Sequence, residues 1–475
     1  MVVWQFINRY LINQAEFEHK TLRVCPHSMR LAGISISSFS LKLLALLLLA
    51  LVVSGCSGSS TPASIDDPFV GPAPPVNPNI PPEKIRLEVW LDLDFVKDDD
   101  LFAEIASDFE KVYPQVTVDI QSFVGRSMPQ KVSQTVLTGT PPDVVQGHVY
   151  AMAGQGLAEP LNRQWEEWGP DAADQFLPAA LEEVTWERTR YGVPLDIFTL
   201  VLLYNRTHFD EAQLPYPEGN YDVLAFQQTA AALTQPDKNR YALGFTADPW
   251  YVYAWLADAG GDVLSGSPER GFSLTFNLKS NIDALRFLTG MVREGYGLPP
   301  ITRPRDYEDA RKQFLAGQTS MIIGGPWDIH LIQSAYPDFA LGVARLPRTP
   351  AADSAASVLG STGLFIPRGA RHRDAAFEFM KWASSDRYAI PMARRLGRYP
   401  AKAWLQTSPY FAENLLLVPF FNQLNAARPY HLDLFPAVEE IFADAIKASF
   451  YGVDPADALN EAQEDGQIFV GGSSS

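Results

Sequence analysis

Residues 84–93 read KIRLEVWLDL, and they begin the alternation of strands and helices that decides the fold class. Apolar side chains occupy every second position, which predicts a strand with one buried face. Asp98–Asp100 follow where an N-cap and a first helical turn are expected, ahead of apolar residues at helical spacing as far as Val112. The acid run therefore indicates helix capping in preference to a metal site.

The same alternation continues to the end of the chain. Tyr113-Pro114 ends the first helix. Further strands are predicted at 116–120, 142–145, 198–204, 320–324 and 362–367. Further helices are predicted at 132–137, 150–156, 281–293, 310–316, 374–384 and 437–450. Strands that alternate with helices in this way predict an α/β fold with parallel sheets.

Length and charge limit the classes of function. The chain has 475 residues, which is enough for two or three domains or lobes with a well-developed core. Its 38 Lys and Arg residues stand against 55 Asp and Glu residues, so the net charge is −17. A general nucleic-acid binder needs a basic face that neutralises phosphate. We therefore expect no nucleic-acid partner.

The N-terminal part has the features of a secretion signal. The apolar run Leu43–Val53 follows Lys42 and is too short to span a bilayer, which needs about 20 residues. It leads into Val53-Ser54-Gly55-Cys56, which resembles the bacterial lipobox, where a peptidase cuts before the cysteine and the cysteine then carries lipid. We therefore predict that a lipidated Cys56 anchors the protein to a membrane. The alternative is a plain secretory signal with an incidental cysteine.

The same region suggests where the folded part starts. Residues 1–28 carry Glu16 and Glu18, although a secretion signal should be short and basic. We therefore expect Met29 to be the true start, and residues 1–56 to contain the signal peptide with its lipobox. Residues 57–83 are rich in Ser, Gly and Pro, which predicts a flexible tether.

Motifs for catalysis and metal binding are missing from the sequence. It contains no G-x-S-x-G elbow, H-E-x-x-H helix, C-x-x-C pair or Gly-Lys phosphate loop. Cys25 and Cys56 are the only cysteines. The histidines after Cys56 are widely separated: His148, His208, His330, His372 and His431. We therefore expect no catalytic residue, no metal site and no cofactor.

Aromatic residues next to turn residues are the strongest sign of a ligand site. Trp327 follows Gly324-Gly325-Pro326, directly after a predicted strand, and Asp328 comes next. Ligands bind at the carboxyl ends of strands in open α/β sheets, so we interpret Trp327 as an exposed ligand platform. A second aromatic patch contains Trp250, Tyr251, Tyr253 and Trp255. For Tyr253 and Trp255 we favour packing in the core.

Several segments in order resemble a known family over about residues 85–462. The segments are LTGTPPDVV (137–145), GLAEPL (156–161), VP to LYNR (193–206), FLAGQTSM to Trp327 (314–327), GSTGL (360–364), GRYP (397–400) and ALN (458–460). Together they resemble the extracellular solute-binding proteins of ABC importers, in the sugar-binding family that includes maltose-binding protein. The match at 314–327 is the most specific one.

This resemblance implies a periplasmic-binding-protein type II fold, in which two α/β lobes enclose a ligand cleft. Lobe 1 would contain residues 84–197 and 348–396, and lobe 2 would contain residues 198–347 and 397–475. Trp327 would stack on a pyranose ring, and the segment with Gln146, His148 and Tyr150 would face the cleft from lobe 1. The expected ligand-binding residues are Trp327, Asp328, Trp250, Tyr251, His148, Tyr150, Asp196, Phe198, Ser361, Thr362, Arg398 and Tyr399.

The chemistry of a sugar agrees with this set. A sugar has apolar C–H faces that pack on aromatic rings, and hydroxyl groups that need paired partners when buried. We therefore predict an extracytoplasmic, lipid-anchored, monomeric binding protein. It would capture a sugar or oligosaccharide by hinge closure and deliver it to the transmembrane permease of an ABC importer.

Three alternatives stay open. The same fold could bind a glycerol phosphodiester, a polyamine or a metal chelate instead of a sugar. A surface glycosidase would need two carboxyl groups that converge across the cleft, which a single sequence does not exclude. A receptor in signalling would use the closed form in the same way as a transport protein.

Overall fold

The computed structural model describes residues 71–470, except 79, 93–99, 124–127, 219–220, 301–305 and 350–355. The described residues all belong to one compact unit, Ala63–Ser475. The predicted signal peptide and Cys56 lie outside the described residues. In the part of the chain that the structure describes, no helix has the length and apolar character needed to cross a membrane.

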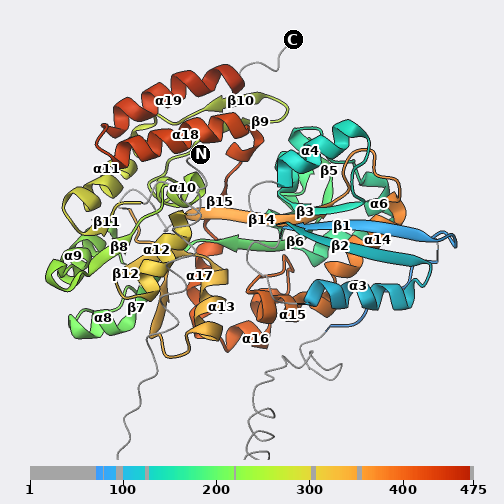
Figure 1. The fold of residues 1–475 in the computed structure, drawn as a ribbon, viewed down its shortest axis with the longest axis horizontal. Helices are drawn as coiled ribbons and strands as arrows, with labels where there is room; N and C mark the ends of the chain where they lie inside the picture. The colour runs from blue at the N-terminus through green and yellow to red at the C-terminus, as the bar shows by residue number, and fades with distance from the viewer. Residues whose placement is uncertain are drawn as a thin grey trace, which may run out of the picture. The chain divides into compact units, whose positions relative to one another are not determined.

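The first sheet contains six strands in the order β15-β14-β3-β1-β2, with β6 on the other edge of β14 (Figure 1). β1 pairs in parallel with β2 and β3, whereas β14 runs antiparallel to β3 and β6. The strands are β1 (Ile85–Asp92), β2 (Val116–Phe123), β3 (Val144–Gly147), β6 (Gly192–Thr199), β14 (Ser357–Phe365) and β15 (Ala427–Pro429). We call this sheet with its helices lobe 1.

Helices cover both faces of the first sheet. Leu87 and Leu91 of β1 share a core with α3 and α14, whereas Trp90 points to the opposite face, where it shares a core with α4 and α5. These helices and their neighbours are α3 (Leu101–Val112), α4 (Met128–Thr138), α5 (Val149–Gly154), α6 (Asn162–Trp168), η1 (Pro170–Gln175), α7 (Pro178–Glu182), α14 (Arg373–Ala383) and α15 (Asp386–Leu396). A short hairpin joins β4 (Thr185–Trp186) to β5 (Thr189–Arg190).

The second sheet contains five strands in the order β11-β8-β12-β7-β13. β8 and β12 are parallel, and β7 runs antiparallel to β12 and β13. The strands are β7 (Val201–Asn205), β8 (Tyr241–Gly244), β11 (Gly297–Leu298), β12 (Thr319–Gly324) and β13 (Leu341–Ala344). We call this sheet with its helices lobe 2.

The helices of lobe 2 also lie on both faces of their sheet. Leu202 and Tyr204 of β7 belong to one core, and Val201 and Leu203 belong to the other. The helices are α8 (Arg206–Glu211), α9 (Val223–Leu233), η2 (Pro236–Lys238), α10 (Pro249–Asp258), α11 (Lys279–Arg293), α12 (Asp306–Leu315), α13 (Pro326–Ala335), α18 (Pro436–Phe450) and α19 (Pro455–Val470). A hairpin joins β9 (Leu264–Ser267) to β10 (Gly271–Leu274).

The chain crosses between the two lobes three times. It leaves the first sheet where β6 continues through Leu200 into β7, and it returns from β13 to β14. It leaves again where β15 leads through η5 (Leu432–Leu434) into α18. The expectation of purely parallel sheets is wrong for these crossing strands. β6 takes the chain out of the first sheet, and β14 brings it back beside β6. The two strands must therefore run in opposite directions.

Residues 397–426 lie where the two lobes meet. They contain η3 (Leu405–Thr407), α16 (Pro409–Ala412), η4 (Leu415–Leu417) and α17 (Val418–Leu424). Tyr399, Phe411 and Phe420 share one apolar core with strands of both sheets. α17 contacts β6 and β14 as well as β7 and β13. The predicted limits of the lobes remain a prediction, because this segment packs against both of them.

The second part of the predicted tether packs on lobe 1. The backbone N–H of Asn77 donates to the Tyr113 hydroxyl at 2.8 Å, and its side-chain amide donates to Glu378 Oε2 at 3.1 Å. Ile80 is buried in the core of this lobe. These contacts fix the described residues before β1 to helices α3 and α14.

The elements that flank the site agree well with their predicted ranges. α3 begins at Leu101 and ends before Tyr113, as predicted. Asp100 occupies the N-cap position, but its side chain makes no capping hydrogen bond. β12 and α18 begin within one residue of their predicted starts. Together these elements place Trp327 directly after the carboxyl end of a strand, as the sequence predicts.

Candidate functional site

Three of the predicted ligand-binding residues form an aromatic group where lobe 2 meets a crossing strand. Phe198 comes from β6, Trp250 from the first turn of α10 and Trp327 from the first turn of α13. The Phe198 ring lies 5.7 Å from Trp250 and 5.5 Å from Trp327, and it meets both edge-on. The two indoles lie 6.2 Å apart at 38°. All three residues are half-buried, so part of each ring remains accessible.

The local sequence explains why the two tryptophans stand at helix starts. Asp248 caps α10 by accepting the backbone N–H of Trp250 at 3.0 Å, and Pro249 occupies the first turn. Pro326 has the same place in α13, directly after Gly325. A Cβ atom on Gly325 would lie only 2.4 Å from the Trp327 ring. Glycine is therefore required for the indole to fold back over this turn.

A second glycine accommodates Phe198. A Cβ atom on Gly360 of β14 would lie 2.0 Å from the Phe198 ring, so the ring lies directly over the neighbouring crossing strand. Any larger residue at position 360 would displace the Phe198 ring. The aromatic group is thus attached to the crossing strands as well as to lobe 2.

Asp328 and Tyr251 lie next to this group but are buried inside lobe 2. Asp328 is completely buried and accepts the Gly325 N–H at 2.9 Å, Arg311 Nη1 at 3.4 Å and the Tyr307 hydroxyl. Burial raises the pKa of Asp328, and the positive charge of Arg311 partly offsets this. Tyr251 stacks on Tyr307 at 4.2 Å. Asp328 thus fixes the start of α13 through its bond with Gly325, whereas Tyr251 packs against Tyr307 of α12.

A polar network joins the crossing strands to each other. Asp196 Oδ1 accepts the Thr362 N–H at 2.9 Å and the Thr362 hydroxyl at 2.6 Å, and Asp196 Oδ2 pairs with Arg398 Nη1 at 2.7 Å. The Ser361 hydroxyl donates to the Asp196 carbonyl at 2.7 Å. Gln146 Nε2 donates to the Thr362 hydroxyl at 3.1 Å. The structure brings these predicted residues together in one network of hydrogen bonds and an ion pair.

Tyr399 follows Arg398 but belongs to the core. Its ring is 4% exposed and lies 5.3 Å from Phe411 and 4.8 Å from Phe420. Burial raises the pKa of its hydroxyl well above the usual value. We therefore assign Tyr399 to packing between the lobes.

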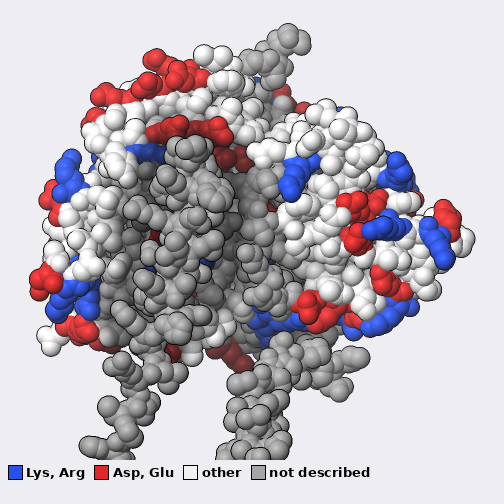
Figure 2. All heavy atoms as spheres, viewed as in Figure 1, with Lys and Arg blue, Asp and Glu red and all other residues white. Residues whose placement is uncertain are grey.

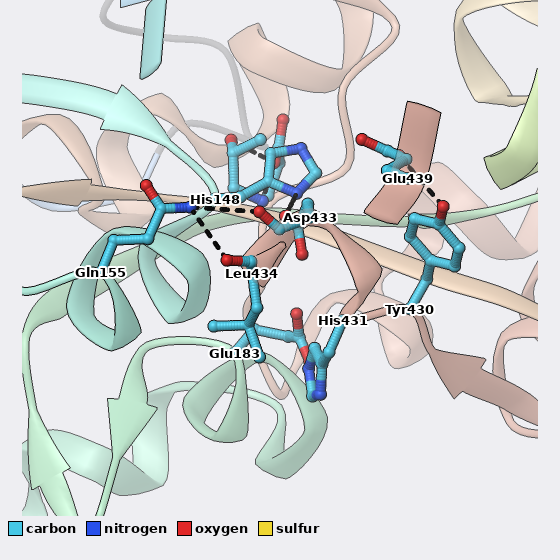
Figure 3. A network of polar contacts seen from close by, with 10 residues as sticks. His148, Gln155, Glu183, Tyr430, His431, Asp433, Leu434 and Glu439 are labelled. Atoms are coloured by element: carbon cyan, nitrogen blue, oxygen red, sulfur yellow. Dashed lines mark hydrogen bonds and ion pairs between the residues drawn. The ribbon is translucent and has the colours of Figure 1, made fainter. Parts of the chain in front are cut away.

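His148 and Tyr150 contact Asp433 and His431 of the segment that joins β15 to α18. Figure 3 shows His148, His431 and Asp433. His148 Nδ1 lies 3.4 Å from Asp433 Oδ2, and the His148 side chain is 50% exposed. Tyr150 stacks on the His431 ring at 3.8 Å and 12°. His431 Nε2 also lies 2.9 Å from Glu183 Oε1 of lobe 1.

Both histidines of this group are stabilised in their charged form. Partial burial acts to lower the pKa of His148, but the hydrogen bond and charge of Asp433, with the charges of Glu183 and Asp92, raise it to about 9. Burial likewise acts to lower the pKa of His431, but Glu183 and then Asp433 raise it. Each histidine therefore faces a carboxyl group that favours its protonated form.

Sequence reasoning missed the partners in this group. In the sequence His431 is one of several widely separated histidines, and no local pattern marks Glu183 or Asp433. Glu183 and His431 are 248 positions apart, so no local pattern connects them. For Asp328, by contrast, a signal existed, because an acid at the third helical position after a proline is typical of helix capping.

Charge, metal ligands and cavities add three observations. Asp and Glu side chains gather along α18 and α19, whereas both signs of charge are mixed over lobe 1 (Figure 2).

Among the described residues, no three or more His, Cys, Asp or Glu side chains are arranged to hold a metal ion. A cavity of about 20 Å³ behind Tyr251 and Tyr307 is large enough for one water molecule but not for a sugar.

Comparison with known proteins gives consistent matches over most of the chain. The family model described as bacterial extracellular solute-binding protein matches residues 96–390. The diacetylchitobiose binding protein DasA of Streptomyces coelicolor is 26% identical over 343 residues, which is 68% of this chain and 74% of that protein.

Two solved structures share the fold. One is the GacH receptor of Streptomyces glaucescens, solved unliganded and in complex with acarbose. It has a TM-score of 0.71 and 21% identity, and the match covers 82% of this chain and all of that one. The other is UgpB from Mycobacterium tuberculosis in complex with glycerophosphocholine. It has a TM-score of 0.70 and 20% identity, and the match covers 81% of this chain and 98% of that one.

Proposed function

This chain belongs to the bacterial extracellular solute-binding protein family, and from that premise we propose that it binds a sugar or oligosaccharide between its two lobes for an ABC importer. The aromatic group of Phe198, Trp250 and Trp327 is the observation that carries this proposal. Three half-buried rings in mutual contact offer apolar faces to the C–H groups of a pyranose. The names of several relatives, including DasA and a maltotriose-binding protein from Pyrococcus abyssi, refer to sugars.

The surroundings of the aromatic group favour a neutral ligand. Arg398, the arginine of the expected set, is paired with the buried carboxylate of Asp196 at 2.7 Å. An anionic ligand would need uncommitted arginines or helix N-termini. The net charge of −17 also acts against an anion at long range. Hydroxyl groups need hydrogen-bond partners but no uncommitted positive charge.

Binding would work by hinge closure. Phe198 lies on a crossing strand, and Trp250 and Trp327 lie on lobe 2, so a ligand that also contacts lobe 1 would be enclosed only when the lobes approach each other. Its binding energy would then shift the equilibrium between open and closed forms. A shift from 1:99 to 99:1 requires about 5.5 kcal/mol of preference for the closed form. The sugar would be released unchanged, without an enzymatic step.

Anchoring and delivery belong to the same proposal. A lipidated Cys56 would hold the monomeric protein at the outer side of the membrane, where the closed, loaded form would be recognised by the permease. Membership of an extracytoplasmic family supports this location.

A second candidate ligand is a glycerol phosphodiester. The likeness to UgpB, which was solved in complex with glycerophosphocholine, favours it. The pairing of Arg398 with Asp196 acts against it, because a phosphodiester carries a negative charge.

A ligand screen by thermal shift, followed by calorimetric titration, tests the proposal. Residues 57–475 would be mixed with mono- and oligosaccharides, polyols, glycerophosphocholine and polyamines, since a ligand that binds the native state raises the melting temperature. We expect a stabilising shift with at least one sugar. A shift with glycerophosphocholine or a polyamine alone would replace the sugar, and hydrolysis of a bound oligosaccharide would replace the binding function by that of a glycosidase.

A further inference from the structure

The segment Tyr430–Phe435 inserts side chains into both lobes. Tyr430 and Leu432 are buried in the core of lobe 2, where the Tyr430 ring lies 5.3 Å from Tyr253 of α10. Leu434 is buried in the core of lobe 1. It lies against α5 so closely that a Cβ atom on Gly154 would approach its Cδ2 atom to 2.5 Å. A segment of six residues is thus fixed at both ends and spans the boundary between the lobes.

Polar contacts attach the same segment to lobe 1 (Figure 3). His431 Nε2 lies 2.9 Å from Glu183 Oε1, and Asp433 Oδ2 lies 3.4 Å from His148 Nδ1. Gln155 Nε2 donates to the carbonyl of Asp433 at 3.2 Å. In one pair the segment contributes the imidazole and lobe 1 the carboxylate, and in the other pair the roles are reversed.

An aromatic contact between two hairpins extends this boundary. Trp186 of the β4–β5 hairpin in lobe 1 lies 6.1 Å from Phe272 of the β9–β10 hairpin in lobe 2. Phe272 in turn lies 5.9 Å from Phe435 at the end of the segment. These contacts join aromatic side chains of the two hairpins and the segment across the boundary.

We propose that Tyr430–Phe435 is a clasp that holds the two lobes together before any ligand is bound. The clasp is closed by the His431–Glu183 and His148–Asp433 pairs and by the stacking of Tyr150 on His431. This inference rests on the proposed hinge closure, and it gives His148 and Tyr150 a role in lobe closure instead of direct ligand contact. A clasp of this kind raises the fraction of closed protein, and so raises the apparent affinity for ligand.

The charges around the clasp are predominantly acidic. His148 faces Asp433, Glu183 and Asp92, and His431 faces Glu183, Asp433 and Asp262. Glu269 of the β9–β10 hairpin acts on Tyr150 and is itself near Arg188 and Arg270. Protonated histidines therefore neutralise a group of carboxylates that would otherwise repel one another across the boundary.

Small-angle X-ray scattering of the unliganded protein tests the clasp. The Glu183→Gln/Asp433→Asn double variant keeps the side-chain shapes but removes both negative charges. We expect its radius of gyration without ligand to exceed that of the wild type, and its apparent Kd for the sugar found in the screen to rise by about threefold to tenfold, in proportion to the lost closed fraction. Asp444→Asn, which breaks an exposed pair with Lys447 within α18, is the control and should change neither quantity.

The outcomes separate the clasp from the proposed function. A folded double variant with an unchanged radius of gyration would overturn the clasp, even if sugar binding is found. A larger radius of gyration supports the clasp, even if the ligand is not a sugar. Asp433→Asn alone is the milder variant for use if the double variant loses its circular dichroism signal, and the same two outcomes apply to it.

Discussion

The ring of Phe198 meets the indole of Trp327 edge-on, at 5.5 Å and 76°, although Phe198 lies on a crossing strand and Trp327 lies on a helix of lobe 2. The contact couples a predicted sugar platform to a strand that must bend or twist when the lobes move. Stacking of a ligand on Trp327 and closure of the lobes would therefore act on the same pair of rings.

Trp327→Ala should weaken sugar binding by about tenfold or more, since an aromatic pair contributes about 0.5–1.5 kcal/mol beyond the area that it buries. Calorimetric titration measures the change. Trp168→Ala removes another half-buried indole, far along lobe 1, and should leave the affinity unchanged. An unaltered Kd in Trp327→Ala would remove this residue from the site.

Asp196→Asn should lower the free energy of unfolding by about 3 kcal/mol, because removing one charge of a buried pair leaves the other uncompensated. Asp196 is completely buried, and its partner Arg398 is 11% exposed. Urea unfolding measures the loss. Asp119→Asn breaks an exposed pair with Arg86 and should cost under about 1 kcal/mol. Equal losses in the two variants would contradict the structural role of Asp196.

The pH dependence of stability should contain a contribution from His148. The pKa of this residue is raised from 6.5 to about 9 in the folded protein. Its stabilising contribution is therefore fully present below pH 6.5 and is lost as the pH rises through 9. Melting temperatures measured between pH 6 and 9.5 should fall more steeply for the wild type than for His148→Gln.

The matched control for this measurement is His372→Gln, which changes a histidine outside the clasp. Its melting temperature should follow the wild-type pH profile. If His148→Gln also follows that profile, the ion pair with Asp433 does not contribute to stability.

Truncation of the N-terminal segment should destabilise lobe 1. A chain that starts at Glu83 lacks Ile80 and the hydrogen bonds of Asn77 to Tyr113 and Glu378, whereas a chain that starts at Gly71 retains them. The difference in unfolding free energy should be about 2 kcal/mol, from one buried aliphatic side chain and two hydrogen bonds. Identical urea midpoints for the two chains would show that this segment is dispensable.

Periodicity and residue preference predicted most of the elements that position the site. α3, α14 and α18 follow apolar spacings of a helix, and β1 follows a spacing of two. The direction of the crossing strands was not predictable in this way. Side-chain alternation is the same in parallel and antiparallel strands, so it carries no information about which neighbour a strand pairs with.

The site was predictable only in part, for a related reason. Trp327 stands beside turn residues after a predicted strand, and the structure places it directly after the carboxyl end of β12. That Trp250 and Trp327 both lie in the first turn of a helix was not predicted. Asp328, Tyr251 and Tyr399 carry the same kind of functional groups but are buried, and burial depends on what packs on them from distant parts of the chain. The His431–Glu183 pair is invisible to local reasoning for the same reason.

The apolar core formed by residues 397–426 with strands of both sheets constrains how the protein can move. Pulling the lobes straight apart, or sliding one along the other, would expose the buried rings of Tyr399 and Phe420 to water. A rotation about the crossing strands would keep these rings buried. We therefore expect the lobes to open by rotation about the crossing strands, so that they separate on the side opposite these strands. Ligands would enter and leave only on the side of the cleft opposite the crossing strands. There the end of a long oligosaccharide could protrude while one or two of its rings are held between the lobes.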